Sequence, residues 1–256
     1  MIKHQMTTKV KNITIIVPAL SLIYAILSSL GFTGIETDAG GVVYRVIIIA
    51  ALIYACKMGF TLPLPGGEDS ETGRGSLNHA LLAGWLGILA FAIFEIHTFA
   101  YIYIYKGAPT DLTISAYTVN CAYLFFISAT LILIPPIFKI HKIIRPSIVT
   151  ICTIAMFFIY YAIIISNYRI LAYFDLVITI LCLLTAVFLF FQADKNSATR
   201  LFATSIFIIC LLGTANRILL IATLGQYLHD IIISFYPAAY LLIGYALVHM
   251  RKEKDG

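Results

Sequence analysis

Long apolar runs recur along this chain from end to end, and they limit its fold more than any other feature of the sequence. Each run is close to the roughly 20 residues that an α-helix needs to cross a bilayer core about 30 Å thick. In lipid every backbone N–H and C=O must be bonded within the protein, so only helices and closed barrels span it. The runs are continuous and lack the alternation of barrel strands. The sequence therefore predicts an all-α, polytopic integral membrane helix bundle.

The composition excludes a soluble domain. Of the 256 residues, 61% are hydrophobic and only 11% are charged, far from the balance of a soluble globular protein. The formal net charge of +5 does not indicate nucleic acid, because the basic residues gather at the ends of the apolar runs. The lipid bilayer is therefore the expected partner, and no nucleotide-binding glycine motif is present.

We expect about eight transmembrane helices in a single domain over residues 1–256. Pro135 and Pro136 should kink or end the fourth helix, because proline removes a backbone donor and clashes with the preceding turn. Pro237 is expected to kink the eighth helix and Pro18 the first. The expected spans cover residues 13–31, 42–60, 79–105, 114–138, 147–167, 170–192, 201–224 and 229–249.

The distribution of Lys and Arg predicts the orientation. With both termini cytoplasmic, thirteen Lys and Arg residues fall in the inner segments, while the outer loops hold only Lys106 and Arg169. This is the asymmetry of the positive-inside rule, and it predicts an even number of spans in the plasma membrane. The loop at 61–78 is rich in Gly, Pro and acidic residues, so we expect a flexible cytoplasmic segment, either a linker or a docking site for a partner membrane protein.

The cysteines and histidines give no metal or cofactor motif. The five cysteines lie inside apolar runs without a CxxC pair, which is typical of small buried side chains. They are Cys56, Cys121, Cys152, Cys182 and Cys210. His97 and His229 are expected near the outer mouth, but HExxH is absent and two scattered histidines do not define a metal or haem site. We expect no metal and no cofactor.

Five charged or strongly polar side chains lie inside five different spans, at similar depth. A charge in the hydrocarbon region costs several kcal/mol, so such residues usually face the bundle interior and pair or bind something. With about 1.5 Å rise per residue, all five are on the outer side of their helix centres. His97 lies slightly further out. The candidate site residues are Arg45, Glu95, His97, Asn120, Asp175 and Arg217.

Depth alone predicts how these charges pair. Glu95 and Arg217 agree best in depth, which leaves Arg45 and Asp175 as the second pair. Three interpretations stay open. The charges can form ion pairs that fix packing, an arginine can face a ligand anion, or Arg45 and Asp175 can snorkel towards the membrane surface.

Two further patterns refine the site. Glu95 and His97 point about 200° apart on a helix, whereas His97 and Tyr101, four residues apart, share one face. The inner halves of the spans carry hydroxyls, such as Ser128 and Thr130, but almost no charge. This asymmetry favours a pocket open to the outside over a through-channel.

The sequence predicts a small-molecule or lipid receptor, a sensor or a subunit of a membrane complex, and no specific catalytic motif is present. One alternative is an embedded hydrolase of lipid-like substrates, with Glu95 or Asp175 as general base and Arg217 or His97 stabilising developing charge. The other is a small-solute transporter.

Overall fold

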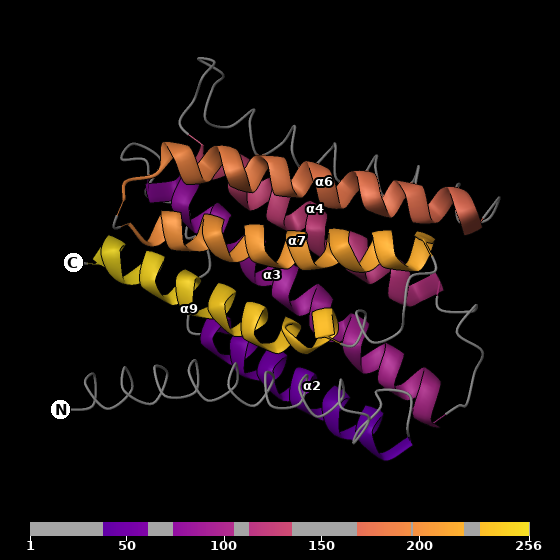
Figure 1. Ribbon diagram of the computed structural model, residues 1–256. Coiled ribbons are helices and arrows are strands. Elements are labelled where there is room, and N and C mark those ends of the chain that lie inside the picture. Colours follow the sequence, from indigo (N-terminus) through magenta and orange to yellow (C-terminus); the bar gives the residue numbers. More distant parts are fainter. Residues whose placement is uncertain are drawn as a thin grey trace.

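The computed structural model describes residues 38–60, 74–104, 113–134, 168–195, 197–222 and 231–255, and this part of the chain is all-helical. Figure 1 shows the long helices lying side by side along a common direction. They are α2 (Asp38–Phe60), α3 (Arg74–Phe99), α4 (Thr113–Leu133), α6 (Tyr168–Gln192), α7 (Ala198–Ala222) and α9 (Tyr236–Asp255), with a π-helical extension of α3, η1 (Ala100–Ile104).

Within the described residues, four stretches are long and apolar enough to cross a membrane, which confirms an all-helical fold with helices that could span a bilayer. They are Leu77–Phe99, Asp175–Gln192, Ala198–Leu219 and Ile231–Glu253. A shorter apolar stretch, Thr118–Leu133, lies in α4. The expected spans at 13–31 and 147–167, the kink at Pro18 and most of the expected loops at 61–78 and 106–113 fall outside the described residues. The count of eight spans thus stays a prediction. The last five residues of the 61–78 loop were predicted wrongly, because α3 already begins at Arg74.

The six long helices pack in a closed order. Each of α2, α3, α4, α6, α7 and α9 packs against the next, and α9 packs back onto α2. Contacts between α3 and α9, and between α4 and α7, cross the interior. In Figure 1, α6 and α4 lie at one edge and α2 at the other, with α7, α3 and α9 between them. Side chains from distant parts of the sequence are thereby brought together in the bundle interior.

Proline determines where two helices end or begin. Helix α4 stops at Leu133, just before Pro135, as expected for a residue that cannot continue a helical hydrogen-bond ladder. The eighth expected helix is interrupted by a turn at Phe235, and α9 begins at Tyr236. Pro237 therefore lies in the first turn of α9, where a missing N–H costs nothing. The sequence predicted a kink or a stop at Pro135 in a span reaching residue 138, and α4 ends at Leu133. It predicted a kink at Pro237, and the apolar stretch Ile231–Glu253 has a single turn residue at Phe235.

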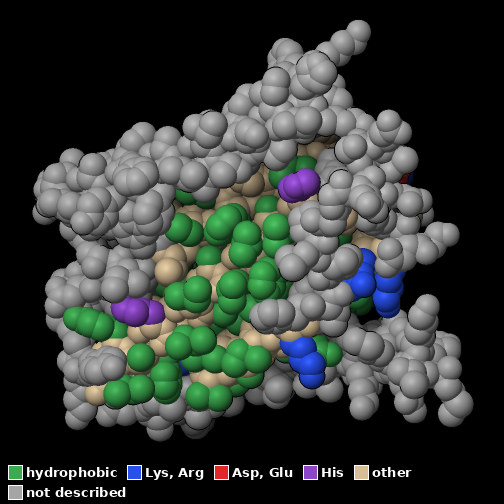
Figure 2. Space-filling view, turned by 180° about the vertical axis from the view of Figure 1, so that it is seen from behind, with side chains coloured by type: hydrophobic (Ala, Val, Ile, Leu, Met, Phe, Trp, Pro, Cys, Tyr) green, Lys and Arg blue, Asp and Glu red, His purple; other side chains and the backbone are tan. Residues whose placement is uncertain are grey.

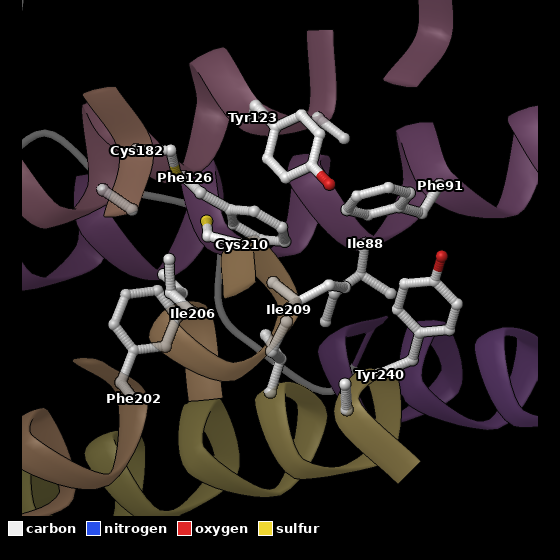
Figure 3. Close-up of a cluster of buried hydrophobic side chains, with 14 of the residues drawn as sticks. Ile88, Phe91, Tyr123, Phe126, Cys182, Phe202, Ile206, Ile209, Cys210 and Tyr240 are labelled. Carbon is white, nitrogen blue, oxygen red and sulfur yellow. The ribbon is translucent and has the colours of Figure 1, made fainter. Parts of the chain in front are cut away.

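An aromatic cluster forms the centre of the bundle. The ring of Phe91 in α3 lies 5.5 Å from Tyr123, 5.9 Å from Phe126 and 5.0 Å from Tyr240, measured between centroids. Figure 3 shows these rings facing Ile206 and Ile209 of α7. All six side chains are fully or almost fully buried. Rings at these separations make favourable edge and tilted contacts, so the cluster fixes how α3, α4, α7 and α9 sit together.

Two glycines allow close helix contact. A Cβ on Gly213 of α7 would overlap the Tyr123 hydroxyl, and one on Gly87 of α3 would lie 2.8 Å from Cδ1 of Phe126. Small residues at such contacts are the usual means of close approach between membrane helices. Both glycines bring their helices against α4.

The surface of the bundle suits a lipid environment. Figure 2 shows hydrophobic side chains across one face, with Lys and Arg mainly at the right-hand end. On α6, exposed apolar side chains recur every three or four residues and form one stripe, which we interpret as lipid-facing. The stripe comprises Tyr173, Val177, Ile180, Leu181, Leu184, Phe188 and Phe191.

Candidate functional site

The packing of the helices brings the polar side chains to one end of the bundle. Arg45, Asn120 and Asp175 lie in the first halves of α2, α4 and α6. Glu95 and Arg217 lie in the second halves of α3 and α7, which run the opposite way. These five residues, with Asn216 and Tyr236 described below, are here called the polar layer. The acidic and amide side chains are buried: Glu95 is 4% exposed, Asn120 2% and Asp175 3%.

Arg45 and Glu95 form the first cluster of the polar layer. The Arg45 guanidinium donates from Nη1 to Oε2 of Glu95, joining α2 to α3. The side chain of Arg45 is 16% exposed. Arg45 therefore pairs inside the bundle and does not snorkel. A carboxylate this buried is costly unless an opposite charge and hydrogen bonds compensate for its lost hydration.

Asp175 is the centre of the second cluster, and both its carboxylate oxygens are bonded. Nη2 of Arg217 lies 3.2 Å from Oδ2, and Nδ2 of Asn120 donates to Oδ1. The cluster joins α4, α6 and α7 through one carboxylate. The side chain of Arg217 is 26% exposed. Among the four charged side chains of the two clusters, it is the one most accessible to solvent or to a ligand.

The pairing predicted from depth was wrong. Glu95 pairs with Arg45 rather than Arg217, and Asp175 pairs with Arg217 rather than Arg45. The reason is helix adjacency: α2 packs on α3, and α6 packs on α7. Equal depth permits a contact, but only neighbouring helices turned towards each other make one.

Tyr236, at the start of α9, is a further polar side chain at this end of the bundle. It is near enough to Arg217, Glu95 and Asn216 for each of them to act on it electrostatically. Asn216 was missed in the sequence, although an amide beside Arg217 in an apolar span was a usable signal.

Two acceptors in the same turns of α7 are buried without a hydrogen-bond partner in the described part of the chain. They are Oδ1 of Asn216 and Oγ1 of Thr214. Buried polar atoms are nearly always bonded, to protein or to a small molecule such as water. Both acceptors lie within three residues of Arg217 along α7. Helix α7 therefore contributes three polar side chains, Thr214, Asn216 and Arg217, to this end of the bundle.

His97 faces Tyr101 on another side of the helix from Glu95. Its ring stacks on that of Tyr101, with centroids 6.0 Å apart and planes inclined by 14°. This confirms that His97 and Tyr101 share a face of the helix, while Glu95 turns into the bundle. Among the residues that the structure describes, no three His, Cys, Asp or Glu side chains are placed to hold a metal ion, and His229 and Cys152 lie outside them. The other four cysteines are free, buried or half-buried.

Beyond the aromatic cluster, towards the other end of the bundle, hydroxyls bond within the protein. Oγ1 of Thr130 lies 3.0 Å from that of Thr185, joining α4 to α6. Ser128, Thr204 and Ser205 each donate to the backbone carbonyl four residues earlier. Such bonds satisfy hydroxyls in an apolar environment, so these groups act in packing.

Comparison with protein-family models, with curated proteins and with solved structures finds no match for this chain. The site's chemistry must therefore be read from its own geometry. Two carboxylates, each paired with an arginine, lie with two amides and a tyrosine in a polar layer of balanced charge within an apolar bundle.

Proposed function

We propose that this chain is an eight-span plasma-membrane protein with both termini cytoplasmic, whose polar layer forms an outward-facing binding site. In this proposal it acts as a receptor or sensor for a small molecule or lipid, or as the ligand-binding subunit of a membrane complex. The observation that carries the proposal is the concentration of buried charge from α2, α3, α6 and α7 at one end of the bundle.

The basic residues support the outward orientation of the site. Lys57 lies in the last turn of α2, Arg200 in the first turn of α7, and Arg251 and Lys252 near the end of α9. All lie at the end of the bundle opposite the polar layer. By the positive-inside rule that end faces the cytoplasm, so the polar layer faces outward.

The core supports a closed site rather than a channel. Inward of the polar layer come Phe91, Phe126 and Tyr240, all buried and in ring contact. A path for ions or polar solutes requires polar groups or water along its length. The aromatic cluster provides neither, which favours a receptor over the transporter alternative.

The accessible part of Arg217 supports ligand binding. Its guanidinium presents several donors, and the acceptors of Thr214 and Asn216 lie beside it on α7. A few convergent polar groups in apolar surroundings are typical of ligand sites. A group with both donor and acceptor atoms would be complementary to this part of the layer.

Thermal-shift measurements on the purified protein in nanodiscs test the proposal, using panels of polar metabolites and bilayer lipids. We expect a compound class that raises the Tm of the wild type and leaves the Tm of Arg217→Gln unchanged. Lys252→Gln, a charge removal of the same kind at the other end, should keep the wild-type response. A response that survives Arg217→Gln would contradict this site.

Two further assays separate the alternatives. Flux of the compound into proteoliposomes would identify a transporter. Turnover of a lipid that Glu95→Gln abolishes while the variant stays folded would identify a hydrolase. Binding with neither flux nor turnover is the result expected of a receptor.

A further inference from the structure

The exposed apolar stripe of α6 leads to the basic end of the bundle. Its last members are highly accessible: Leu184 is 57% exposed, Phe188 40% and Phe191 79%. Phe191 lies in the last turn of α6, which ends at Gln192. Lys195 follows in the turn before α7, and its side chain is exposed. The apolar face of α6 therefore passes directly into a segment that carries a cation.

Helix α7, which packs beside α6 (Figure 1), has a matching face. Leu211 and Ile218 are each 49% exposed, and residues seven or eleven apart lie within about 20° of one another around a helix. Arg200 precedes Leu211 by eleven residues, so it lies on the same face, in the first turn of α7. Thr204 and Phe207 lie between them on this face and are half-buried. The exposed face of α7 thus ends at a cation as well.

An aromatic ring of α6 holds the Arg200 guanidinium in place. Its Cζ lies 4.1 Å from the centroid of the Phe190 ring, a separation at which a cation is attracted to the face of the ring. The exposed ring of Phe191 stands edge-on to that of Phe190, with centroids 5.6 Å apart and planes inclined by 82°. The guanidinium is therefore fixed where α6 meets α7, next to an exposed apolar surface.

The backbone at the start of α7 is already bonded, so an anion here would be recognised by side chains. The Ala198 N–H donates to Oε1 of Glu253 at 2.8 Å, and the Arg200 N–H donates to Oγ of Ser197 at 3.2 Å. Glu253 comes from α9, and α7 lies between α9 and α6. Its carboxylate therefore belongs to the side of α7 that faces away from the Phe190 ring.

The charge on the α6 side of this corner is positive. Lys195 and Arg200 each carry one positive charge, and the exposed carboxylate of Asp194 lies in the same connection. The backbone carbonyl of Asp194 accepts hydrogen bonds from the N–H and the hydroxyl of Ser197, which fixes the shape of the connection. These three side chains together leave a net positive charge beside the apolar faces of two helices.

The dimensions of this surface fit one leaflet of a bilayer. Eleven residues separate Arg200 from Leu211, which is about 16 Å along α7. Half of a hydrocarbon core about 30 Å thick is about 15 Å. Arg200 is the third residue of the apolar stretch Ala198–Leu219, so its long side chain can reach the headgroups while its stem stays in apolar surroundings. An acyl chain that starts at this level would end near Leu211.

We propose that this corner of the bundle binds one anionic phospholipid. Arg200 and Lys195 hold its phosphate, and an acyl chain lies along the exposed faces of α6 and α7. A guanidinium matches phosphate because it donates paired hydrogen bonds to two oxygens. A zwitterionic phospholipid has the same phosphate, but its own cationic group would be repelled by Lys195. The site lies at the opposite end of the bundle from the polar layer and goes beyond the function proposed for that layer.

Native mass spectrometry of the full-length protein in detergent tests the proposal, with phosphatidylglycerol and phosphatidylcholine of equal chain length as probes. We expect the wild type to bind the first phosphatidylglycerol at least about fivefold more tightly than phosphatidylcholine. Arg200→Gln and Lys195→Gln should each weaken the binding of phosphatidylglycerol about fivefold. Lys195 lies in an exposed turn, so Lys195→Gln provides the test even if Arg200→Gln does not fold.

Lys57→Gln is the matched control, because it removes the same charge at the same end of the bundle. Lys57 is exposed in the last turn of α2, which packs against α3 and α9. Its affinity for phosphatidylglycerol should equal that of the wild type. An equal loss in Lys57→Gln would show that the whole basic end attracts anionic lipid, and it would overturn the proposal. Equal binding of the two lipids by the wild type would overturn it too.

Two further measurements examine the ring and the source of the phosphate. Phe190→Leu keeps both cations but removes the ring under the guanidinium, so we expect about two- to fivefold weaker binding of phosphatidylglycerol. Excess glycerol phosphate should not displace the lipid, because it lacks the acyl chain. Displacement would assign the site to a soluble phosphate and overturn the lipid proposal. Dependence on Arg200 rather than Arg217 distinguishes this site from the polar layer, so each proposal can fail separately.

Discussion

At the scale of single residues, pairing explains how this chain keeps charge inside an apolar bundle. Glu95 has Arg45, and Asp175 has Arg217 and Asn120. Each carboxylate is almost completely shielded from solvent. Replacing its arginine would therefore leave a buried negative charge without a counter-ion. Breaking a buried pair in this way costs far more than replacing both partners.

Double-mutant cycles measure this pairing. Arg45→Gln and Glu95→Gln should each destabilise the protein, and the double variant should be less destabilised than the sum, with a coupling of about 1–3 kcal/mol. Unfolding in mixed micelles gives the free energies. Arg45→Gln with Asp175→Asn is the control cycle, expected to be additive within about 0.5 kcal/mol. Stronger coupling in that control would mean that the charges are paired the other way.

At the scale of helices, close contact with α4 holds the second charged cluster in place. Gly213 lies one turn from Arg217 on α7, and it packs on the buried Tyr123, one turn from Asn120 on α4. The glycine thus sets the separation of the two helices just where Asn120 and Arg217 meet Asp175. Packing and polar contacts are coupled because they share these helix turns.

Gly213→Ala tests that coupling. The added Cβ would overlap the Tyr123 hydroxyl and lie 3.2 Å from its Cζ, and a buried ring has little room to move, so we expect destabilisation of about 1–3 kcal/mol. Tyr123→Phe in the same chain should recover part of the loss, since it removes the nearest atom. Wild-type stability of Gly213→Ala in mixed micelles would refute the close contact.

At the scale of the whole molecule, the two ends of the bundle differ in charge. One end holds two buried ion pairs, Arg45 with Glu95 and Arg217 with Asp175. The other end has Arg251 and Lys252 near the end of α9. The aromatic cluster of Phe91, Phe126 and Tyr240 comes between them along α3, α4 and α9. This polarity gives the proposed orientation, with the polar layer outward and the basic end in the cytoplasm.

Reporter fusions test this orientation. A reporter at Ser76, near the start of α3, should be cytoplasmic, and one at Ala108, in the following connection, should be external, because α3 is long enough to cross the membrane between them. An enzyme pair active on opposite sides of the membrane gives the readout. The same side for both fusions would exclude the eight-span topology.

The sequence alone determined those features that depend on one segment at a time. Long apolar runs predict membrane helices because lipid leaves the backbone no other solution. Pro135 predicts a kink or a stop in the fourth helix, close to where α4 ends, and the four-residue spacing predicts the shared face of His97 and Tyr101. Burial of Glu95 followed from the cost of charge in lipid. None of these requires knowing where another helix lies.

Only the tertiary structure decided which charges meet. A soluble helix shows its buried face through a polar opposite face, but a helix that is apolar all round carries no such signal. The rotation of α3 or α7 therefore cannot be read from its own residues. It is set by contacts with neighbours, such as Gly213 on Tyr123, and those contacts decide that Glu95 turns to Arg45.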